Sequence, residues 1–315
     1  MSALSFNEAK DSRKILTLNQ TSNQRTVTAT PRKLARLVAT VFVLVVGCVF
    51  APLAWSQKGQ TIRHLPPNVR LHADFRSQFL PKGRQIFVYL PPDYEKNEAK
   101  RYPVLYLFDG ANSFVVWEVD ETARLLIEAS QIEPLIIVGI EHGGTWEERT
   151  DEYTPTRFKG RGGKGDETAR MLVEEVKPFI DREYRTLPDA AHTGLGGASL
   201  AGILALHIGL RYPNTFGKIA IMSPSVWWDN GVILRSVKSL TAKPTQRIWL
   251  DVGAEEGFMA KDAKRLRDAL IEKGWALDSD LYYFEEKRAT HEDMAWAKRM
   301  PKILRFLFPA TKVGG

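Results

Sequence analysis

The feature that most constrains the fold is an alternation between apolar runs of strand length and amphipathic stretches of helical spacing, which begins near residue 60. Residues 102–110 (YPVLYLFDG) and 134–144 (PLIIVGIEHGG) contain long uninterrupted apolar runs, as expected for strands that are covered on both faces. In residues 166–184, by contrast, apolar side chains recur at helical spacing. The alternation predicts an α/β fold, with a mostly parallel central sheet and helices on both faces.

The expected elements extend over most of the chain. Strands are predicted at residues 71–80, 84–94, 102–110, 134–144, 192–197, 217–224, 247–253 and 281–286. Helices are predicted at residues 118–130, 166–184, from Ser199 onward, 260–274 and 295–308. No internal repeat, low-complexity block or linker rich in Pro, Gly and Ser divides this region, so we expect residues 57–315 to form a single domain.

The net charge of +7 is unevenly distributed along the chain. Residues 1–56 carry seven basic and two acidic side chains, so the remainder is close to neutral. That remainder contains no basic stripe interleaved with aromatic residues, which argues against nucleic acid as a partner.

A run of residues without charge, 37–56 (LVATVFVLVVGCVFAPLAWS), follows the basic segment. Its layout is typical of a secretory signal peptide, with Ala54 and Ser56 at the −3 and −1 positions for cleavage before Gln57. Two alternatives remain open: lipidation of Cys48, the only cysteine, and an uncleaved membrane anchor, for which about 20 apolar residues suffice. All three alternatives place the remaining chain outside the cytoplasm, periplasmic or secreted, with membrane contact only through this segment.

Small residues surround Ser199 where an expected strand meets an expected helix, in the stretch GLGGASLAG at residues 194–202. Catalytic serines can occupy such tight turns, where small neighbours let the backbone fold sharply and expose the hydroxyl. The N-terminal amides of the following helix would then face an anion formed near Ser199. We therefore interpret Ser199 as a nucleophile, with a serine that only caps the helix as the alternative.

A nucleophilic serine requires a base, and a third group orients that base. His291 is expected in the loop after the last strand, and the chain order Ser, acid, His favours it. His142 competes with it, because it follows an expected strand and would lie at the same sheet edge as Ser199. For the acid we favour Glu256, in the turn after the strand at 247–253, and Glu255 is the alternative.

Several longer stretches occur together in a definite order. They are FVYLPPDY, YPVLYLFDG, GIEHGGTWEERTDEYTP, LVEEVKPFIDREYRT, GLGGASLAG, YPNTFGKIAIMSPSVWW, LDVGAEEG and THEDMAW. In these stretches the chain resembles the esterase family of α/β hydrolases, which includes enterochelin (ferric siderophore) esterases, S-formylglutathione hydrolases, feruloyl and acetylxylan esterases and mycolyl transferases. The resemblance covers residues 70–309 and is greatest to the enterochelin-esterase branch.

The resemblance implies an α/β-hydrolase fold and a serine esterase, with Ser199 and His291 matched by motif and Glu256 as the acid. It implies acyl transfer to Ser199 followed by hydrolysis with water. The oxyanion donors would be the backbone N–H groups of Leu200 and, in the loop after the strand at 102–110, Ala111.

One residue departs from the family's pattern. The usual turn reads Gly-x-Ser-x-Gly-Gly, whereas Ala201 stands at the first glycine after the serine, and we expect strain there rather than loss of function. Two alternatives to hydrolysis stay open. One is an acyltransferase on the same fold, and the other is a non-catalytic ligand-binding relative, which this departure motivates.

Aromatic and basic side chains near the predicted strand ends are candidates for substrate contacts. They are Trp117, Trp146, Arg149, Trp227 and Trp228. The alternatives are an ion pair of Arg149 with Glu152 and a packed corner for the two adjacent tryptophans. We expect a small-molecule or polysaccharide-linked ester as substrate. The sequence contains neither a metal-ligand spacing nor a phosphate-binding loop, so it implies no cofactor. The oligomeric state does not follow from the sequence.

Overall fold

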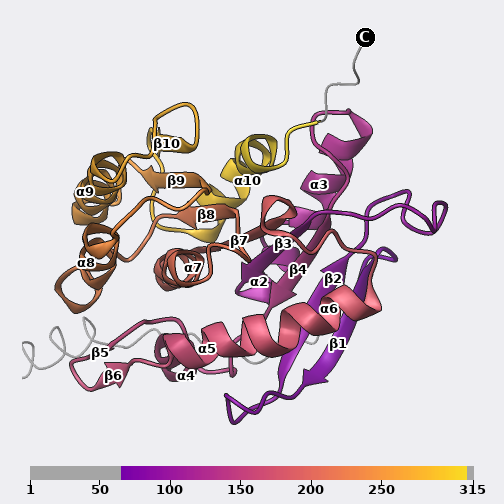
Figure 1. Cartoon of the computed structure of the whole chain (residues 1–315), viewed down its shortest axis with the longest axis horizontal. Helices are drawn as coiled ribbons and strands as arrows, with labels where there is room; N and C mark the ends of the chain where they lie inside the picture. Colours follow the sequence, from indigo (N-terminus) through magenta and orange to yellow (C-terminus); the bar gives the residue numbers. More distant parts are fainter. Residues whose placement is uncertain (1–64, 311–315) are drawn as a thin grey trace, which may run out of the picture. The chain divides into compact units, whose positions relative to one another are not determined.

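An eight-stranded sheet organises residues 65–310, the part of the chain that this computed structural model describes (Figure 1). Its strand order is β1-β2-β4-β3-β7-β8-β9-β10. The strands are β1 (Val69–Phe75), β2 (Arg84–Tyr89), β3 (Val104–Phe108), β4 (Ile136–Ile140), β7 (Thr193–Ala198), β8 (Lys218–Met222), β9 (Arg247–Gly253) and β10 (Leu281–Glu286). A separate hairpin pairs β5 (Arg157–Phe158) with β6 (Arg161–Gly162).

The sheet is mostly parallel, as predicted. Only β1 and β2 run antiparallel to their neighbours, whereas each adjacent pair from β4 to β10 in the spatial order is parallel. The carboxyl ends of β3, β4, β7, β8, β9 and β10 therefore lie along one edge of the sheet. The loops that follow these strands meet at that edge, which is where parallel sheets bind their ligands.

The expected helices are present, and shorter ones occur between them. The helices are α2 (Gly110–Val115), α3 (Val119–Glu128), α4 (Trp146–Glu152), α5 (Gly165–Arg170), α6 (Lys177–Glu183), α7 (Leu200–Arg211), α8 (Val232–Ser239), α9 (Phe258–Glu272) and α10 (Asp293–Leu307), with η1 (Met171–Val176), η2 (Ala190–His192) and η3 (Trp228–Asn230). The sequence did not predict α2, α4, α8 or the β5–β6 hairpin. Each of these is short and has too few turns or alternations to give a clear period.

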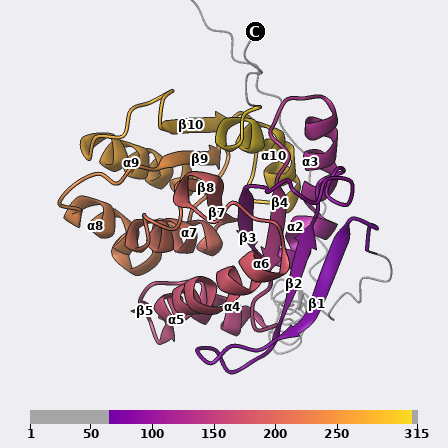
Figure 2. The same ribbon diagram turned by 45° about the vertical axis from the view of Figure 1, so that its right-hand side comes forward.

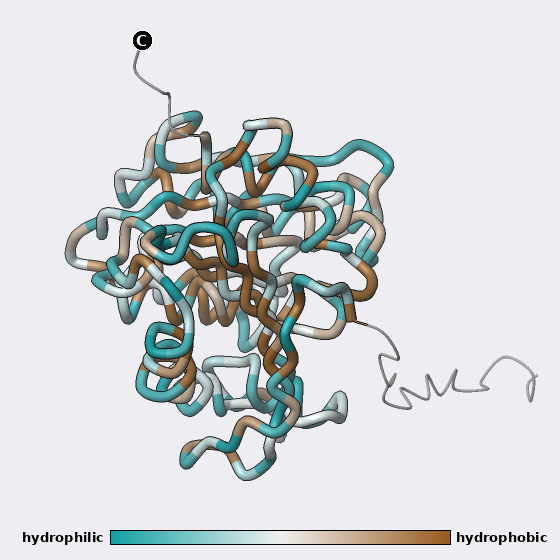
Figure 3. The backbone as a smooth tube through the Cα atoms, turned by 90° about the vertical axis from the view of Figure 1, so that its right-hand side faces the viewer, coloured by the Kyte–Doolittle hydropathy of each residue, from teal (hydrophilic) through white to brown (hydrophobic). Residues whose placement is uncertain are grey.

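Helices cover both faces of the sheet, because successive side chains of a strand point to opposite faces. On β2, Ile86 and Val88 pack into the apolar cluster shared with α7, whereas Phe87 and Tyr89 pack into the cluster shared with α3 and α10. Figure 2 shows α3 beside α10. Figure 3 shows hydrophobic segments concentrated in the interior of the fold. The predicted burial of the strands at 102–110 and 134–144 on both faces is confirmed, since every residue of β3 and β4 is buried.

The predicted helix at 166–184 forms from three consecutive segments, α5, η1 and α6. The middle segment, η1, is a π-helix rather than an α-helix. Pro178 is the second residue of α6, and a proline inside a helix lacks an N–H and clashes with the carbonyl four residues earlier. The wider π turn accommodates that proline while the helix continues.

Several sequence predictions concern residues outside the described part. These are the domain boundary at residue 56, the uncharged run 37–56 and Cys48. Within residues 65–310, no helix combines the length and the apolar composition that crossing a membrane requires.

Candidate active site

The backbone of Ser199 adopts a conformation that is rare for a residue with a side chain. It lies between β7 and α7 with φ 61° and ψ −118°. Such strain persists only where the surrounding structure enforces it, and it is common at functional sites. Here the Ser199 N–H donates to Met222 O at 2.9 Å, and the Ser199 carbonyl accepts from the Ser225 N–H at 3.1 Å. The neighbouring strand β8 and the loop after it therefore fix the turn.

The small residues of β7 are required by close packing. A methyl group added to Gly197 would lie 2.5 Å from Ala201 Cβ, and one added to Gly196 would lie 2.8 Å from Ala220 Cβ. Ala201 itself is fully buried, and its methyl group occupies the space that Gly197 leaves. The strand thus accommodates the residue that departs from the usual glycine.

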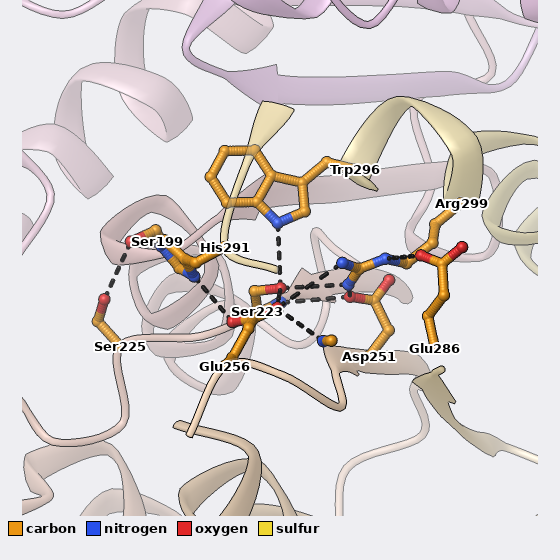
Figure 4. A network of polar contacts seen from close by, with 10 residues as sticks. Ser199, Ser223, Ser225, Asp251, Glu256, Glu286, His291, Trp296 and Arg299 are labelled. Atoms are coloured by element: carbon orange, nitrogen blue, oxygen red, sulfur yellow. Dashed lines mark hydrogen bonds and ion pairs between the residues drawn. The ribbon is translucent and has the colours of Figure 1, made fainter. Parts of the chain in front are cut away.

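His291 reaches Ser199 from the loop between β10 and α10. Its Nε2 lies 3.0 Å from Ser199 Oγ, and its Nδ1 lies 2.8 Å from Glu256 Oε2 (Figure 4). An ionised carboxylate only accepts hydrogen bonds, so the neutral imidazole carries its proton on Nδ1 and leaves Nε2 free to accept from the serine hydroxyl. The ring also packs edge-on against Trp296, with a centroid separation of 5.0 Å. The structure therefore brings together all three predicted side chains.

Of the two neighbouring glutamates, Glu256 faces His291 and Glu255 is exposed. The Glu256 carboxylate is fully buried and accepts hydrogen bonds at 2.6 Å from both the Ser223 hydroxyl and the Gly253 N–H. Burial raises the pKa of this carboxyl, but the hydrogen bonds from His291, Ser223 and Gly253 outweigh it and hold the pKa below its usual value. The group is therefore ionised and oriented at neutral pH.

His142, the competing histidine, has other partners. It is buried, its Nε2 lies 3.1 Å from Glu141 Oε1, and its Nδ1 accepts from the Gly144 N–H at 3.1 Å. Burial lowers the pKa of His142, so the ring is neutral with its proton on Nε2. Both partners belong to the loop after β4, and Ser199 is not among them.

The two predicted oxyanion donors differ in their surroundings. Leu200 is the first residue of α7, where a backbone N–H has no partner within its own helix. The N–H of Ala111, near the start of α2, instead donates to Glu141 Oε2 at 2.7 Å. Burial and the neighbouring charge of Asp109 raise the pKa of Glu141 to about 7. The Ala111 N–H, which is predicted to donate to the substrate, therefore already donates to a carboxylate.

Sequence reasoning missed Ser225, whose Oγ lies 3.1 Å from Ser199 Oγ. It also missed Ser223 and Arg299, which lie behind Glu256 (Figure 4). The two serines belong to a stretch that follows a strand at the carboxyl edge of the sheet, and this position could have singled them out. Arg299, on α10, gave no comparable signal.

Two of the proposed substrate contacts have structural partners instead. Trp117 is buried and donates to Asp293 Oδ1 at 2.8 Å, and Trp228 is buried and donates to Thr156 O at 2.9 Å. These placements correct the prediction that the two tryptophans contact substrate, because their polar atoms and most of their surface are enclosed.

Arg149 forms a two-bond ion pair with Asp109, with both N–O distances at 2.7 Å. Its predicted partner Glu152 pairs with Arg84 at 2.8 Å, so that alternative was wrong. Trp146 and Trp227 remain open to solvent, with 59% and 39% of their surface exposed. Within residues 65–310, no three His, Cys, Asp or Glu side chains are grouped so that they could hold a metal ion.

Comparison with known proteins identifies the family. A family model described as "Putative esterase" matches residues 77–307. The chain belongs to this esterase family. The esterase is 30% identical over 242 residues to the uncharacterized protein YbbA of Bacillus subtilis (strain 168). The matched region covers 72% of this chain and 93% of YbbA. It is 27% identical over 226 residues to the Iron(III) enterobactin esterase of Escherichia coli (strain K12), covering 69% of this chain and 52% of that protein.

The structure of the esterase also resembles solved structures. The BES protein from Bacillus cereus superimposes with a TM-score of 0.65 at 25% identity, over 78% of this chain and 97% of that protein. The predicted family, α/β-hydrolase fold and esterase class are confirmed by these similarities together.

Proposed function

We propose that the esterase cleaves carboxylic esters through an acyl-enzyme on Ser199, with His291 as the base and Glu256 as the acid. The observation that carries this proposal is the continuous set of hydrogen bonds from Ser199 Oγ through the imidazole to the buried Glu256 carboxylate. A serine in a strained turn, a histidine in the required tautomer and an ionised acid are the parts that acyl transfer to serine requires.

In the first step, Ser199 Oγ bonds to the ester carbonyl carbon and its proton passes to His291 Nε2. The resulting imidazolium, with Nδ1–H directed at Glu256, then gives that proton to the departing alcohol oxygen as the carbon–oxygen bond of the ester breaks. Water repeats the sequence on the acyl-enzyme, losing its proton to Nε2 and releasing the carboxylic acid and free Ser199. Each half-reaction returns the imidazole to its neutral form.

The tetrahedral intermediate requires hydrogen-bond donors for its oxyanion. We assign the Leu200 N–H as one donor, because it begins α7 directly after the nucleophile. The second is the Ala111 N–H, and the substrate carbonyl must compete there with Glu141. Protonation of the Glu141 carboxyl weakens it as an acceptor and so favours the substrate.

We propose a small-molecule or polysaccharide-linked ester as the substrate. Trp146 and Trp227 are exposed near the same sheet edge, where they offer flat apolar surfaces to a substrate. One relative has the name Iron(III) enterobactin esterase, so siderophore esters are one class of substrate to test. Feruloyl, acetyl and other small esters complete the panel.

The test measures hydrolysis of p-nitrophenyl acetate and of the ester panel by the purified protein and by Ser199→Ala. We expect the wild type to turn over and to react with a fluorophosphonate probe, and the variant to lose both properties. Activity that is unchanged in Ser199→Ala would refute the proposal, and absence of probe labelling in the wild type would favour a ligand-binding protein. An acyltransferase would transfer the acyl group to an added alcohol in preference to water.

We also propose that the enzyme is exported, on the basis of the basic segment and the uncharged run at 37–56. Fractionation of cells that produce the full chain tests this proposal. N-terminal sequencing of the exported product distinguishes cleavage before Gln57 from lipidation at Cys48 and from an uncleaved anchor. Activity confined to the cytoplasm would contradict it.

A further inference from the structure

The carboxylate of Glu256 is held in place by a residue that has no contact with the nucleophile. We propose that Ser223 is a positioning residue, whose hydroxyl separates Glu256 from Arg299 and keeps the carboxylate directed at His291. The inference rests on the proposed function, since it assigns the orientation of the acid in that mechanism.

The direction of the Ser223 hydroxyl proton follows from its three polar neighbours. Trp296 Nε1 lies 3.0 Å from Ser223 Oγ and Arg299 Nη1 lies 3.1 Å from it. Both groups are donors only, so they occupy the two lone pairs of the hydroxyl oxygen. The single hydroxyl proton is left for Glu256 Oε1, at 2.6 Å. Figure 4 shows Ser223 between Glu256 and Arg299.

Arg299 is itself fixed at several points. It is 1% exposed, its Nε donates to Glu286 Oε2 at 3.0 Å, and its Nη1 also contacts Asp251 Oδ1. Asp251 in turn accepts from Trp249 Nε1 at 2.7 Å. Residues from β9, β10 and α10, together with Ser223 directly after β8, thus meet around one guanidinium.

The guanidinium has one group that is not yet satisfied. Arg299 Nη2 is buried without a hydrogen-bond partner among the described residues, and it lies 3.7 Å from Glu256 Oε1. A direct pair between Arg299 and Glu256 would satisfy that nitrogen, but it would compete with His291 for the carboxylate. The Ser223 hydroxyl donates to Glu256 Oε1 and accepts from Arg299 Nη1, so a neutral group bridges the acid and the cation.

Ser223→Ala removes one of the two hydrogen bonds to Glu256 Oε1 and leaves only the Gly253 N–H on it, so the carboxylate can turn toward Arg299. We expect kcat to fall about tenfold, the loss typical of one hydrogen bond to a charged group, while KM changes by less than twofold. Because the Ser223 hydroxyl is one of the hydrogen bonds that hold the pKa of Glu256 below its usual value, that pKa should rise in the variant, and the pH profile of kcat/KM should change with it. In proton NMR, the downfield resonance of the hydrogen-bonded His291 Nδ1–H should broaden or disappear.

The matched control is Thr186→Val. Thr186 is 1% exposed and donates its hydroxyl to Asp181 Oδ1 at 2.7 Å, so this variant also removes a buried hydroxyl from a carboxylate but at another place. It should leave kcat, the pH profile and the downfield resonance unchanged. Ser223→Cys, which keeps a weaker donor of similar shape, should lie between Ser223→Ala and wild type.

A folded Ser223→Ala protein with wild-type kcat and an unchanged resonance would overturn the inference. So would failure of both Ser223 variants to fold, since the side chain would then act on stability and not on the acid. The outcome is separable from the proposed function. Absence of esterase activity and of fluorophosphonate labelling in the wild type refutes that function, whereas the Nδ1–H resonance reports the Glu256 contact without any turnover.

Discussion

Trp117 and Asp293 are joined by a hydrogen bond of 2.8 Å from the indole Nε1 to the carboxylate Oδ1. Asp293 begins α10 and follows His291 by two residues, while Trp117 lies between α2 and α3. Asn112, on α2, also donates to Asp293 Oδ1, at 3.4 Å. The segment that carries the proposed base is therefore attached to helices that come much earlier in the chain.

Trp117→Phe should release this attachment. We expect the free energy of unfolding to fall by about 1 to 2 kcal/mol, as for loss of a hydrogen bond to a charged group, and kcat to fall at least threefold because His291 is held less firmly. Trp275→Phe is the control, since Trp275 is 1% exposed, donates to Gln246 O at 3.1 Å and packs in the apolar cluster that contains no residue of α10. Urea unfolding and esterase kinetics measure both effects, and an equal kcat for the two variants would contradict the prediction.

Glu256→Gln and Glu255→Gln compare the two adjacent acids directly. Replacing the buried carboxylate by an amide removes the charge that favours the correct tautomer, and we expect kcat to fall by about 10³ to 10⁴. The exposed Glu255 should give a change below twofold. Steady-state kinetics on p-nitrophenyl acetate decides, and similar losses in the two variants would exclude a special role for Glu256.

The contact between Gly197 and Ala201 can be tested as a pair. Gly197→Ala should destabilise the protein by about 1 to 3 kcal/mol, because its methyl group would lie 2.5 Å from Ala201 Cβ. Ala201→Gly should cost about 1 kcal/mol from lower helix propensity and leave activity within a few fold. The double variant should recover part of the first loss, measured by chemical denaturation. Strict additivity of the two changes would show that the residues do not interact.

Glu141→Gln should change how stability depends on pH. The folded protein holds the Glu141 proton up to about pH 7, whereas the unfolded chain releases it near its ordinary value of 4.5. Between these values the folded state binds more protons, so wild-type stability falls as pH rises through this window. The advantage of Glu141→Gln over wild type should therefore grow by about 2 to 3 kcal/mol from pH 4.5 to pH 8. Urea midpoints across this range test it, and a constant difference would contradict it.

The sequence supplied the strands of the central sheet, the serine turn and the order of Ser199, Glu256 and His291, because those depend on local period and on chain order. It favoured Glu256 but did not exclude Glu255, since adjacent residues of one turn point in different directions. Nor could it find that Arg149 pairs with Asp109, 40 residues earlier, instead of the nearby Glu152. Such pairings depend on which loops meet at the edge of the sheet.

Packing decided the remaining side chains. Trp117 and Trp227 are both tryptophans near strand ends, yet the first is 2% exposed and the second 39%. That difference arises from α10 covering one of them, a long-range contact that leaves no trace in the neighbouring residues. The same applies to Arg299, whose acidic partners Asp251 and Glu286 lie on β9 and β10.

The three side chains of the candidate site follow β7, β9 and β10, and 92 residues separate His291 from Ser199. During synthesis the serine turn therefore leaves the ribosome long before its base, and a chain released before residue 291 holds the proposed nucleophile without the means to activate it. Under the proposed mechanism, ester cleavage requires that the last strand and the last helix have docked. Measured turnover would then report that folding is complete, and the nascent chain would have no hydrolytic activity before that point.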